Sequence, residues 1–123
     1  MSEPSEAARS MEIMFRNGSS QTLRRNNIRL DHGIWSHDGS NVPPEQIPPR
    51  TKAYWASESN GLGTGTEGQA IYDTDLGQVV IDWNVPFVGG AEFDVGVPPG
   101  LARLHDFSSA SNIFVTVALD DDF

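Results

Sequence analysis

The sequence predicts an all-β fold, a single-domain antiparallel β-sandwich, from two observations. Short segments with alternating apolar and polar residues recur along the 123 residues, and turn-forming residues separate them. An apolar repeat of the helical period is not sustained anywhere in the chain. A small barrel is the alternative, because alternation alone does not distinguish two packed sheets from one closed sheet.

Composition divides the chain into three parts. Residues 1–10, which carry Pro4 among Ser, Glu and Ala, are expected to form a disordered lead-in. Residues 11–119 are expected to form the sandwich domain. Residues 120–123 form an acidic tail, which discourages pairing at a sheet edge.

The first half of the domain begins with a strand at 11–17, where apolar side chains alternate with Glu12 and Arg16. Residues 21–35 are expected to form two short strands with a break at Asn26–Asn27 or a bulge near Gly33. The prolines of 36–50 exclude a central strand, so this segment is predicted to be a long surface loop. Ile47 is its expected anchor in the core.

The stretch from Tyr54 to Tyr72 has two alternating runs separated by glycines, and it predicts either a β-hairpin or a corner between sheets. Glycine permits positive φ and close backbone approach, which explains the cluster Gly61, Gly63, Gly65 and Gly68. A phosphate-binding loop is disfavoured, because no Lys-Ser or Lys-Thr pair follows and no helix pattern begins there.

The second half begins with a strand at 78–83 that is apolar on both faces, as central strands are. A loop at 84–90 presents Phe87, and its proline and glycines give it a defined shape. Residues 91–97 alternate again and predict another strand. Residues 101–112 are expected to be irregular or a short helical turn, and 113–119 to be the final strand.

Charge limits the possible partners. The chain has 17 acidic and 8 basic residues, a formal net charge of -9, which repels nucleic-acid backbones and anionic lipid surfaces. There are no cysteines, so disulfides do not hold the fold. Neither a classical signal peptide nor a membrane-spanning apolar run is apparent, which predicts a soluble protein. A neutral or zwitterionic lipid, a sugar or a protein remains open as partner.

Three motifs resemble the aegerolysin family, most of all the small component of bacterial binary insecticidal crystal toxins. They are Leu30-Asp31-His32-Gly33-Ile34-Trp35, the segment from Ser57-Glu58-Ser59-Asn60-Gly61 to Thr64-Gly65-Thr66-Glu67-Gly68, and Pro86-Phe87-Val88-Gly89. The resemblance implies a β-sandwich that recognises a membrane lipid, often a sphingolipid with or without sterol. It also implies cytolysin-like action at target membranes, outside the cell, with a larger pore-forming protein partner.

The chain departs from that pattern in the second loop. Toxin-like members read Asp-Asn-Pro-Phe and then Gly-Ser-Asn, whereas this chain reads Asn84-Val85-Pro86-Phe87 and then Gly89-Gly90-Ala91. Several polar groups of that loop are therefore absent.

Aromatic residues in or beside loops are the candidate lipid contacts, because tryptophan and tyrosine suit a membrane interface. Trp35 and Phe87 are favoured, since the alternation places Trp55 and Trp83 in the core. An acidic side chain beside an aromatic ring suits a choline-type ammonium group. The candidate lipid-binding residues are Trp35, Phe87, Tyr54, Trp55, Trp83, Glu67 and Asp31.

A non-enzymatic module that binds carbohydrate or protein is the alternative function, because aromatic platforms suit sugar rings as well as lipids. An enzyme is not expected, since nothing in the spacing forces a base and a nucleophile to converge. We name no catalytic residue, metal ligand or cofactor. The nearest metal motif, Asp31-His32 with His37-Asp38, lacks the tighter paired spacing of zinc sites.

Overall fold

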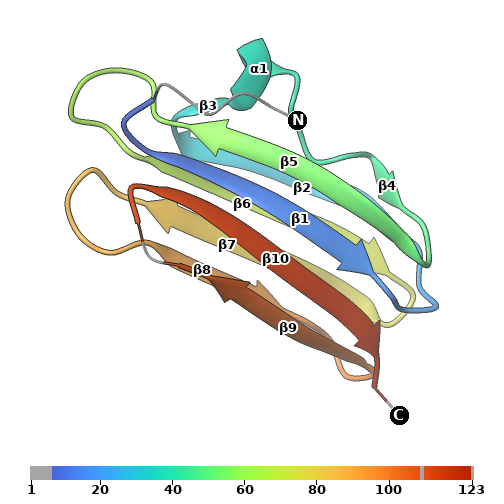
Figure 1. The fold of residues 1–123 in the computed structure, drawn as a ribbon. Helices are drawn as coiled ribbons and strands as arrows, with labels where there is room; N and C mark the ends of the chain where they lie inside the picture. Colours follow the sequence, from blue (N-terminus) through green and yellow to red (C-terminus); the bar gives the residue numbers. More distant parts are fainter. Residues whose placement is uncertain (1–6, 109, 123) are drawn as a thin grey trace.

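The computed structural model describes residues 7–108 and 110–122, which form two packed five-stranded sheets (Figure 1). Sheet A has the strand order β3-β5-β1-β10-β9 and sheet B the order β4-β2-β6-β7-β8. This arrangement confirms the predicted all-β sandwich. The elements are β1 (Ser10–Asn17), β2 (Leu23–His32), β3 (Ile34–Trp35), α1 (Ser36–Gly39), β4 (Gln46–Ile47), β5 (Thr51–Glu58), β6 (Thr66–Thr74), β7 (Gly77–Val85), β8 (Glu92–Gly96), β9 (Leu101–Phe107) and β10 (Asn112–Asp121).

One strand pair departs from the antiparallel arrangement. β1 and β10 run parallel, with Ser10 opposite Asn112 and Asn17 opposite Leu119. The other strand pairs of the described residues are antiparallel. The parallel pair joins the two ends of the described chain in the middle of sheet A, where each of these strands has neighbours on both sides.

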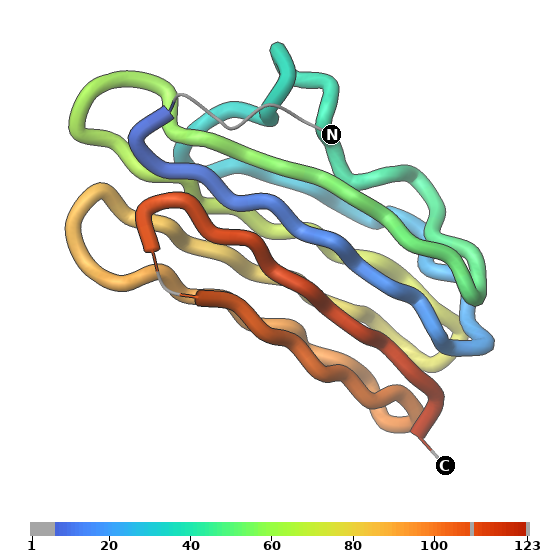
Figure 2. The backbone as a smooth tube through the Cα atoms, viewed as in Figure 1, coloured from blue at the N-terminus to red at the C-terminus, as the bar shows by residue number. Residues whose placement is uncertain are grey.

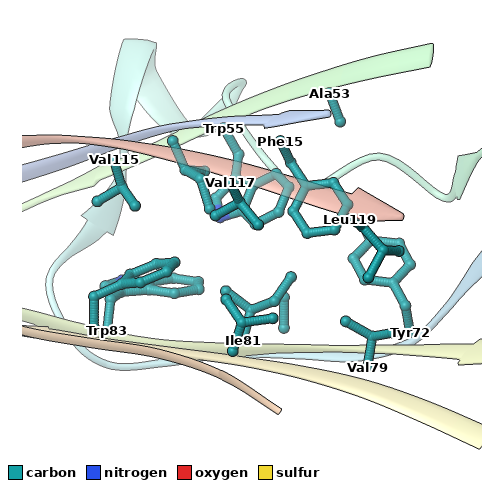
Figure 3. Packing of buried hydrophobic residues seen from close by; sticks show 14 of the residues in the cluster. Phe15, Ala53, Trp55, Tyr72, Val79, Ile81, Trp83, Val115, Val117 and Leu119 are labelled. Atoms are coloured by element: carbon teal, nitrogen blue, oxygen red, sulfur yellow. The ribbon is translucent and has the colours of Figure 1, made fainter. Parts of the chain in front are cut away.

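Aromatic side chains from both sheets fill the space between them (Figure 3). Phe15 and Trp55 point inward from sheet A, and their ring centroids lie 6.1 Å apart. Tyr72 and Trp83 point inward from sheet B and lie 6.4 Å and 6.5 Å from the Trp55 ring. The inward positions follow the alternation in the sequence, because successive side chains of a strand point to opposite faces.

The segment 21–35 forms one long strand with irregularities. The pairing of β2 with β6 shifts between Arg25 and Asn27, so the expected break there is a bulge. A second shift follows Leu30, and Gly33 then turns the chain into β3 with a φ of 97°. β3 pairs with β5, so the chain moves from sheet B to sheet A at Gly33.

The glycine-rich stretch is a corner between sheets and not a hairpin. β5 belongs to sheet A and β6 to sheet B, and residues 59–65 connect them. The prediction left both possibilities open. The corner is favoured because Trp55 and Ala70 both face the core from opposite layers.

Two expectations of irregular structure were wrong in part. Residues 101–107 form the edge strand β9, which pairs with β10 over its full length. Its alternation is weak because Leu104 points to solvent and Arg103 donates to the Val95 carbonyl across the open side of the sandwich. The proline-rich loop contains the short α1 and β4, and Ile47 is its anchor, 1% exposed.

The expected ends of the domain also shift. Residues 1–6 of the lead-in and Phe123 of the tail lie outside the described residues. Ser10 already belongs to β1, while β10 continues to Asp121, whose carboxylate accepts a hydrogen bond from the Ser20 amide. Among the described residues, no helix has the length and apolar character needed to span a membrane.

Candidate functional site: an apolar loop end

Two loops project from the same end of the sandwich (Figures 1 and 2). Residues 59–65 connect β5 to β6, and residues 86–91 connect β7 to β8. They meet at Gly65, where an added Cβ would lie 2.8 Å from the Pro86 Cα and 3.1 Å from the Phe87 nitrogen. Only glycine permits this approach, so the sequence itself brings the two loops together.

The tips of these loops expose apolar side chains to solvent. Leu62 is 103% exposed at the tip of the first loop, and Val88 is 83% exposed in the second. Phe87 lies beside Val88 and is 41% exposed. Single exposed apolar residues are ordinary, but three on adjoining loops at one end form a small apolar patch.

A hollow of about 360 Å³ lies beside the patch. Phe87 and Pro86 form its apolar wall, and polar groups come from strands of sheet B and from the first loop. The polar wall contains His32, Thr64, Thr66, Glu67 and Asn84.

A second hollow, of about 210 Å³, adjoins the first on the outer face of sheet B, and Glu67 and Asn84 line both. Carboxylates dominate this second hollow. The His32 Nε2 lies 3.9 Å from the Glu67 Oε1, and the Arg29 Nε lies 3.3 Å from the Asp31 Oδ1. The acidic residues that line the hollow are Asp31, Glu67, Asp82, Glu92 and Asp94.

This charge distribution favours a cationic group on the ligand. Asp82 and Asp94 lie directly opposite each other on β7 and β8, and like charges in that register repel. A positively charged ligand group would relieve this repulsion, whereas a free anion would add to it. The loop end is thus an apolar surface beside an acidic hollow.

Arg9 ties the two loops to the start of β1. Its Nε donates to the Pro86 carbonyl at 3.1 Å, and its Nη2 donates to the Phe87 carbonyl. The guanidinium carbon lies 4.7 Å from the centre of the Phe87 ring, a cation–π contact. The Arg9 amide donates to the Ser59 hydroxyl at 3.1 Å, and the Ser59 amide donates to the Arg9 carbonyl at 2.8 Å. Arg9 therefore contacts both loops.

Buried hydrogen bonds hold the base of the loops in place. The Trp83 Nε1 donates to the Ser57 hydroxyl at 3.1 Å, and that hydroxyl lies 2.7 Å from the Thr66 hydroxyl. Ser57 belongs to sheet A and the other two to sheet B, so the network connects the sheets at the site. Ser57 is fully buried and engaged, which gives it a structural role.

The structure brings only some of the predicted lipid contacts to this end. Phe87 and Glu67 line the first hollow, and Asp31 lines the second. Trp35 is partly buried and packs edge-on against the Trp83 ring at 6.0 Å. One part of the Trp35 side chain therefore packs against the core, and the rest stays exposed.

The other three predicted contacts are tryptophans of the core and a tyrosine on another face. Trp55 and Trp83, 0% and 2% exposed, belong to the core, as their alternating positions predicted. Trp83 also lines the second hollow, whereas Trp55 lines neither hollow. Tyr54 is on the outer face of sheet A, where its hydroxyl donates to the Glu12 Oε1 at 2.9 Å. An outward position in the middle of β5 is far from the loop that follows Glu58.

Leu62, Val88 and Arg9 are site residues that the sequence analysis missed. Leu62 and Val88 are apolar residues within glycine-rich loops, where no pattern of buried positions requires an apolar side chain. That placement was the available signal. Arg9 gave no local signal, because its partners are 77 and 78 residues away in the sequence.

The described residues contain no group of three or more His, Cys, Asp or Glu side chains placed to hold a metal ion. His105 and Asp106 are neighbours in the sequence that could act as a base and its orienting carboxylate. They lie on β9 in sheet A, where the His105 ring packs against Phe93 with 5.2 Å between ring centroids.

Fold and site together define a β-sandwich protein with an apolar, acidic-flanked loop end. The crystal structure of the lipid-binding protein Nakanori has the same fold, with a TM-score of 0.80 over 91% of this chain and 71% of that one, at 11% identity. An uncharacterized protein of Dictyostelium discoideum is 33% identical over 96 residues, which are 76% of this chain. The chain spans 8% of the length of that protein. No protein-family model matches the sequence.

Proposed function

We propose that this protein binds a membrane lipid through the loop end. The observation that carries the proposal is the grouping of Leu62, Phe87 and Val88 on two adjoining loops beside a polar hollow. Such an arrangement suits a membrane interface, where apolar tips enter the boundary of the acyl chains and polar groups contact the headgroup. The similarity of fold to a protein described as lipid-binding supports the proposal.

The first hollow would hold a zwitterionic headgroup. Glu67 supplies a carboxylate for an ammonium group, and the Phe87 ring supplies an aromatic face for the same charge. The side-chain amide of Asn84 lines the same hollow and is a donor for a phosphate. The hydroxyls of Thr64 and Thr66 already form hydrogen bonds within the protein and shape the wall of the hollow. The acidic second hollow disfavours lipids with a net negative charge.

The resemblance to aegerolysins extends the proposal to a sphingolipid, with or without sterol, as the lipid. It also extends it to a larger pore-forming protein as the functional partner, which would make the protein the membrane-recognising component of a cytolysin. The family motifs at 30–35, 57–68 and 86–89 all lie at or beside the loop end, which is the region that such recognition would use.

A binding module within larger proteins is the second candidate. The matching segment makes up only 8% of the Dictyostelium protein, which is how a module in a long chain would match. The same loop end would then present Phe87 and the polar hollow to a carbohydrate or a protein.

Co-sedimentation with liposomes tests the proposal. We would compare phosphatidylcholine alone, with sphingomyelin and with ceramide phosphoethanolamine, each with and without sterol. The double variant Leu62→Glu/Val88→Glu places charges at the tips, and we expect it to abolish binding without lowering the melting temperature.

Leu76→Glu is the matched control, because Leu76 is an exposed leucine, 45% exposed, in the turn between β6 and β7 at the other end of the sandwich. It should bind liposomes like the unchanged protein. Equal binding by both variants would refute the loop end as the lipid site. No pelleting with any mixture would favour the module, and a glycan array would follow.

A further inference from the structure

Basic side chains gather at the end of sheet A that lies opposite the loop end (Figure 1). Arg16, near the end of β1, is directly opposite Lys52, near the start of β5, and both side chains are exposed on the outer face. Like charges in this register repel each other. Neither side chain forms an ion pair or a side-chain hydrogen bond within the described residues. A bound anion would relieve the repulsion.

A third cation reaches the same place from a strained turn. Arg50 has a φ of 58°, a left-handed conformation that glycine or asparagine adopts at lower cost than arginine. The turn is held from within, because the Asn17 Nδ2 donates to the carbonyls of Ile47 and Pro48, both at 3.0 Å. The Arg50 side chain is exposed and has no ion pair in the part of the chain that the structure describes. Packing therefore gives no reason for an arginine here, whereas a third positive charge beside the other two does.

The three cations line one hollow of about 630 Å³. They are three of the eight basic residues in a chain with a net charge of -9. Gly18 also lines the hollow and has no side chain to fill it. Asp120 is the one acidic residue of the lining, and its carboxylate lies against Gly18, where an added Cβ would be 2.5 Å from the Oδ1. The hollow therefore keeps an excess of positive charge in an acidic protein.

An apolar hollow of about 260 Å³ adjoins the basic one, since Arg16 and Lys52 line both. The strand register explains its shape. Ala118 on β10 is opposite Arg16 on one side and opposite Leu104 on the other, so a small side chain lies between two long ones. Leu104 is 75% exposed, and Asp106 also lines this hollow.

We propose that this end of sheet A binds a small organic phosphate, a phosphate monoester with one apolar group. A guanidinium group pairs with a phosphate through two parallel hydrogen bonds, and a lysine adds a point charge. Cations from β1, β5 and the turn before β5 suit a tetrahedral dianion better than a planar carboxylate. The apolar group would lie over Ala118 against Leu104, where Asp106 disfavours a second negative charge.

A lipid with the same headgroup chemistry, phosphatidic acid, is a second source of a phosphate monoester. The net charge of -9 opposes approach to a membrane of that lipid, so we assign the site to a free molecule. The site is at the other end of the sandwich from the loop end, and the assignment does not rest on the proposed function.

An NMR titration of the backbone amides tests the site, at constant ionic strength so that screening is fixed. The probes are inorganic phosphate and phenyl phosphate. We expect saturable shifts at residues 16–18 and 50–52 with both probes, and tighter binding of phenyl phosphate. Arg16→Gln/Lys52→Gln should weaken both by about tenfold or more.

Arg24→Gln is the matched control, because Arg24 is a half-exposed arginine of sheet B that pairs with Asp75. It should bind both probes like the unchanged protein. Shifts that do not saturate, or an unchanged affinity in the double variant, would overturn the proposal.

Two single variants separate the parts of the site. Arg50→Asn removes a charge and keeps the turn, because asparagine tolerates a positive φ. It should weaken the binding of both probes without lowering the melting temperature, and full affinity would contradict the role of Arg50. Leu104→Ser should weaken phenyl phosphate and leave inorganic phosphate unchanged. An equal effect on both probes would contradict the apolar part of the site.

Pelleting with phosphatidylcholine vesicles that contain phosphatidic acid distinguishes a free ligand from a lipid. We expect the unchanged protein and Arg16→Gln/Lys52→Gln to pellet equally. Pelleting that the double variant loses would assign the site to a lipid and overturn the assignment to a free molecule. Loss of vesicle binding through the loop end would leave the titration unchanged, so the two proposals fail separately.

Discussion

Replacement of Arg9 by alanine is the sharpest test of how the loop end is held together. Arg9→Ala removes two hydrogen bonds to the carbonyls of Pro86 and Phe87 and a cation–π contact with the Phe87 ring. Both hydrogen bonds between residue 9 and Ser59 survive, because they use the backbone amide and the backbone carbonyl of residue 9. The change thus releases loop 86–91 from its side-chain restraint.

The size of the effect follows from the contacts. A cation–π contact at an exposed site contributes about 0.5–1 kcal/mol. A hydrogen bond from a charged donor contributes about 1.5–3 kcal/mol when buried, and the Arg9 bonds are exposed or half-buried, which lowers each of them to about 0.5 kcal/mol. The sum is about 1.5–2 kcal/mol, which corresponds to about tenfold to thirtyfold weaker lipid binding if only the restrained loop binds.

The assay combines liposome titration with hydrogen exchange of the loop amides. We expect faster exchange at residues 86–91 and weaker binding, with little change in the melting temperature, because the loop is outside the core. Arg24→Ala is the control, an arginine of sheet B whose ion pair with Asp75 is exposed. Unchanged exchange and unchanged binding in Arg9→Ala would refute the restraint.

Two further predictions concern Gly68 and Tyr72, two residues of β6. Gly68→Ala should destabilise the fold by about 1–3 kcal/mol, because the added Cβ would lie 2.6 Å from the Trp83 Cζ2. Gly96→Ala is the control and should be nearly neutral, since its added Cβ would lie 4.0 Å from the Val80 oxygen. Chemical denaturation of both variants measures the difference. Burial raises the pKa of Tyr72, an effect that Arg25 partly opposes, so the unfolded chain loses this proton first and stability should fall as pH rises above about 10. Tyr72→Phe should lower the free energy of unfolding by about 1 kcal/mol at neutral pH, because the Pro44 carbonyl loses its hydrogen-bond partner at 2.6 Å. It should also reduce the loss of stability above pH of about 10. An identical stability profile at alkaline pH would contradict this.

The sequence analysis succeeded where a side chain's environment follows from its position in a strand. The alternation around Trp55, Trp83 and Ile81 predicted inward positions, and all three are buried. It also identified Ile47 as the anchor of the proline-rich loop, because an isolated apolar residue among prolines has few other reasons to be there. These inferences need only the two-residue period of a strand.

It failed where structure depends on contacts between distant segments. β9 was missed because an edge strand exposes one face and one edge, so Leu104 and Arg103 break the expected pattern. The parallel pairing of β1 with β10 joins residues about a hundred positions apart, and nothing local specifies its direction. Tyr54 was grouped with the loop aromatics because sequence distance from the glycine cluster was short, although its outward position directs it to a different face.

The apolar tips of the loop end set a limit on how tightly one chain would bind a membrane. Burying Leu62, Phe87 and Val88 in a membrane interface would contribute about 4–6 kcal/mol in total, since each starts at least partly exposed. That corresponds to dissociation constants of about 0.04–1 mM for one loop end, before any headgroup contact. The net charge of -9 adds no attraction to a neutral membrane. A single chain would therefore bind weakly and depend on the hollow around Glu67 to select its lipid.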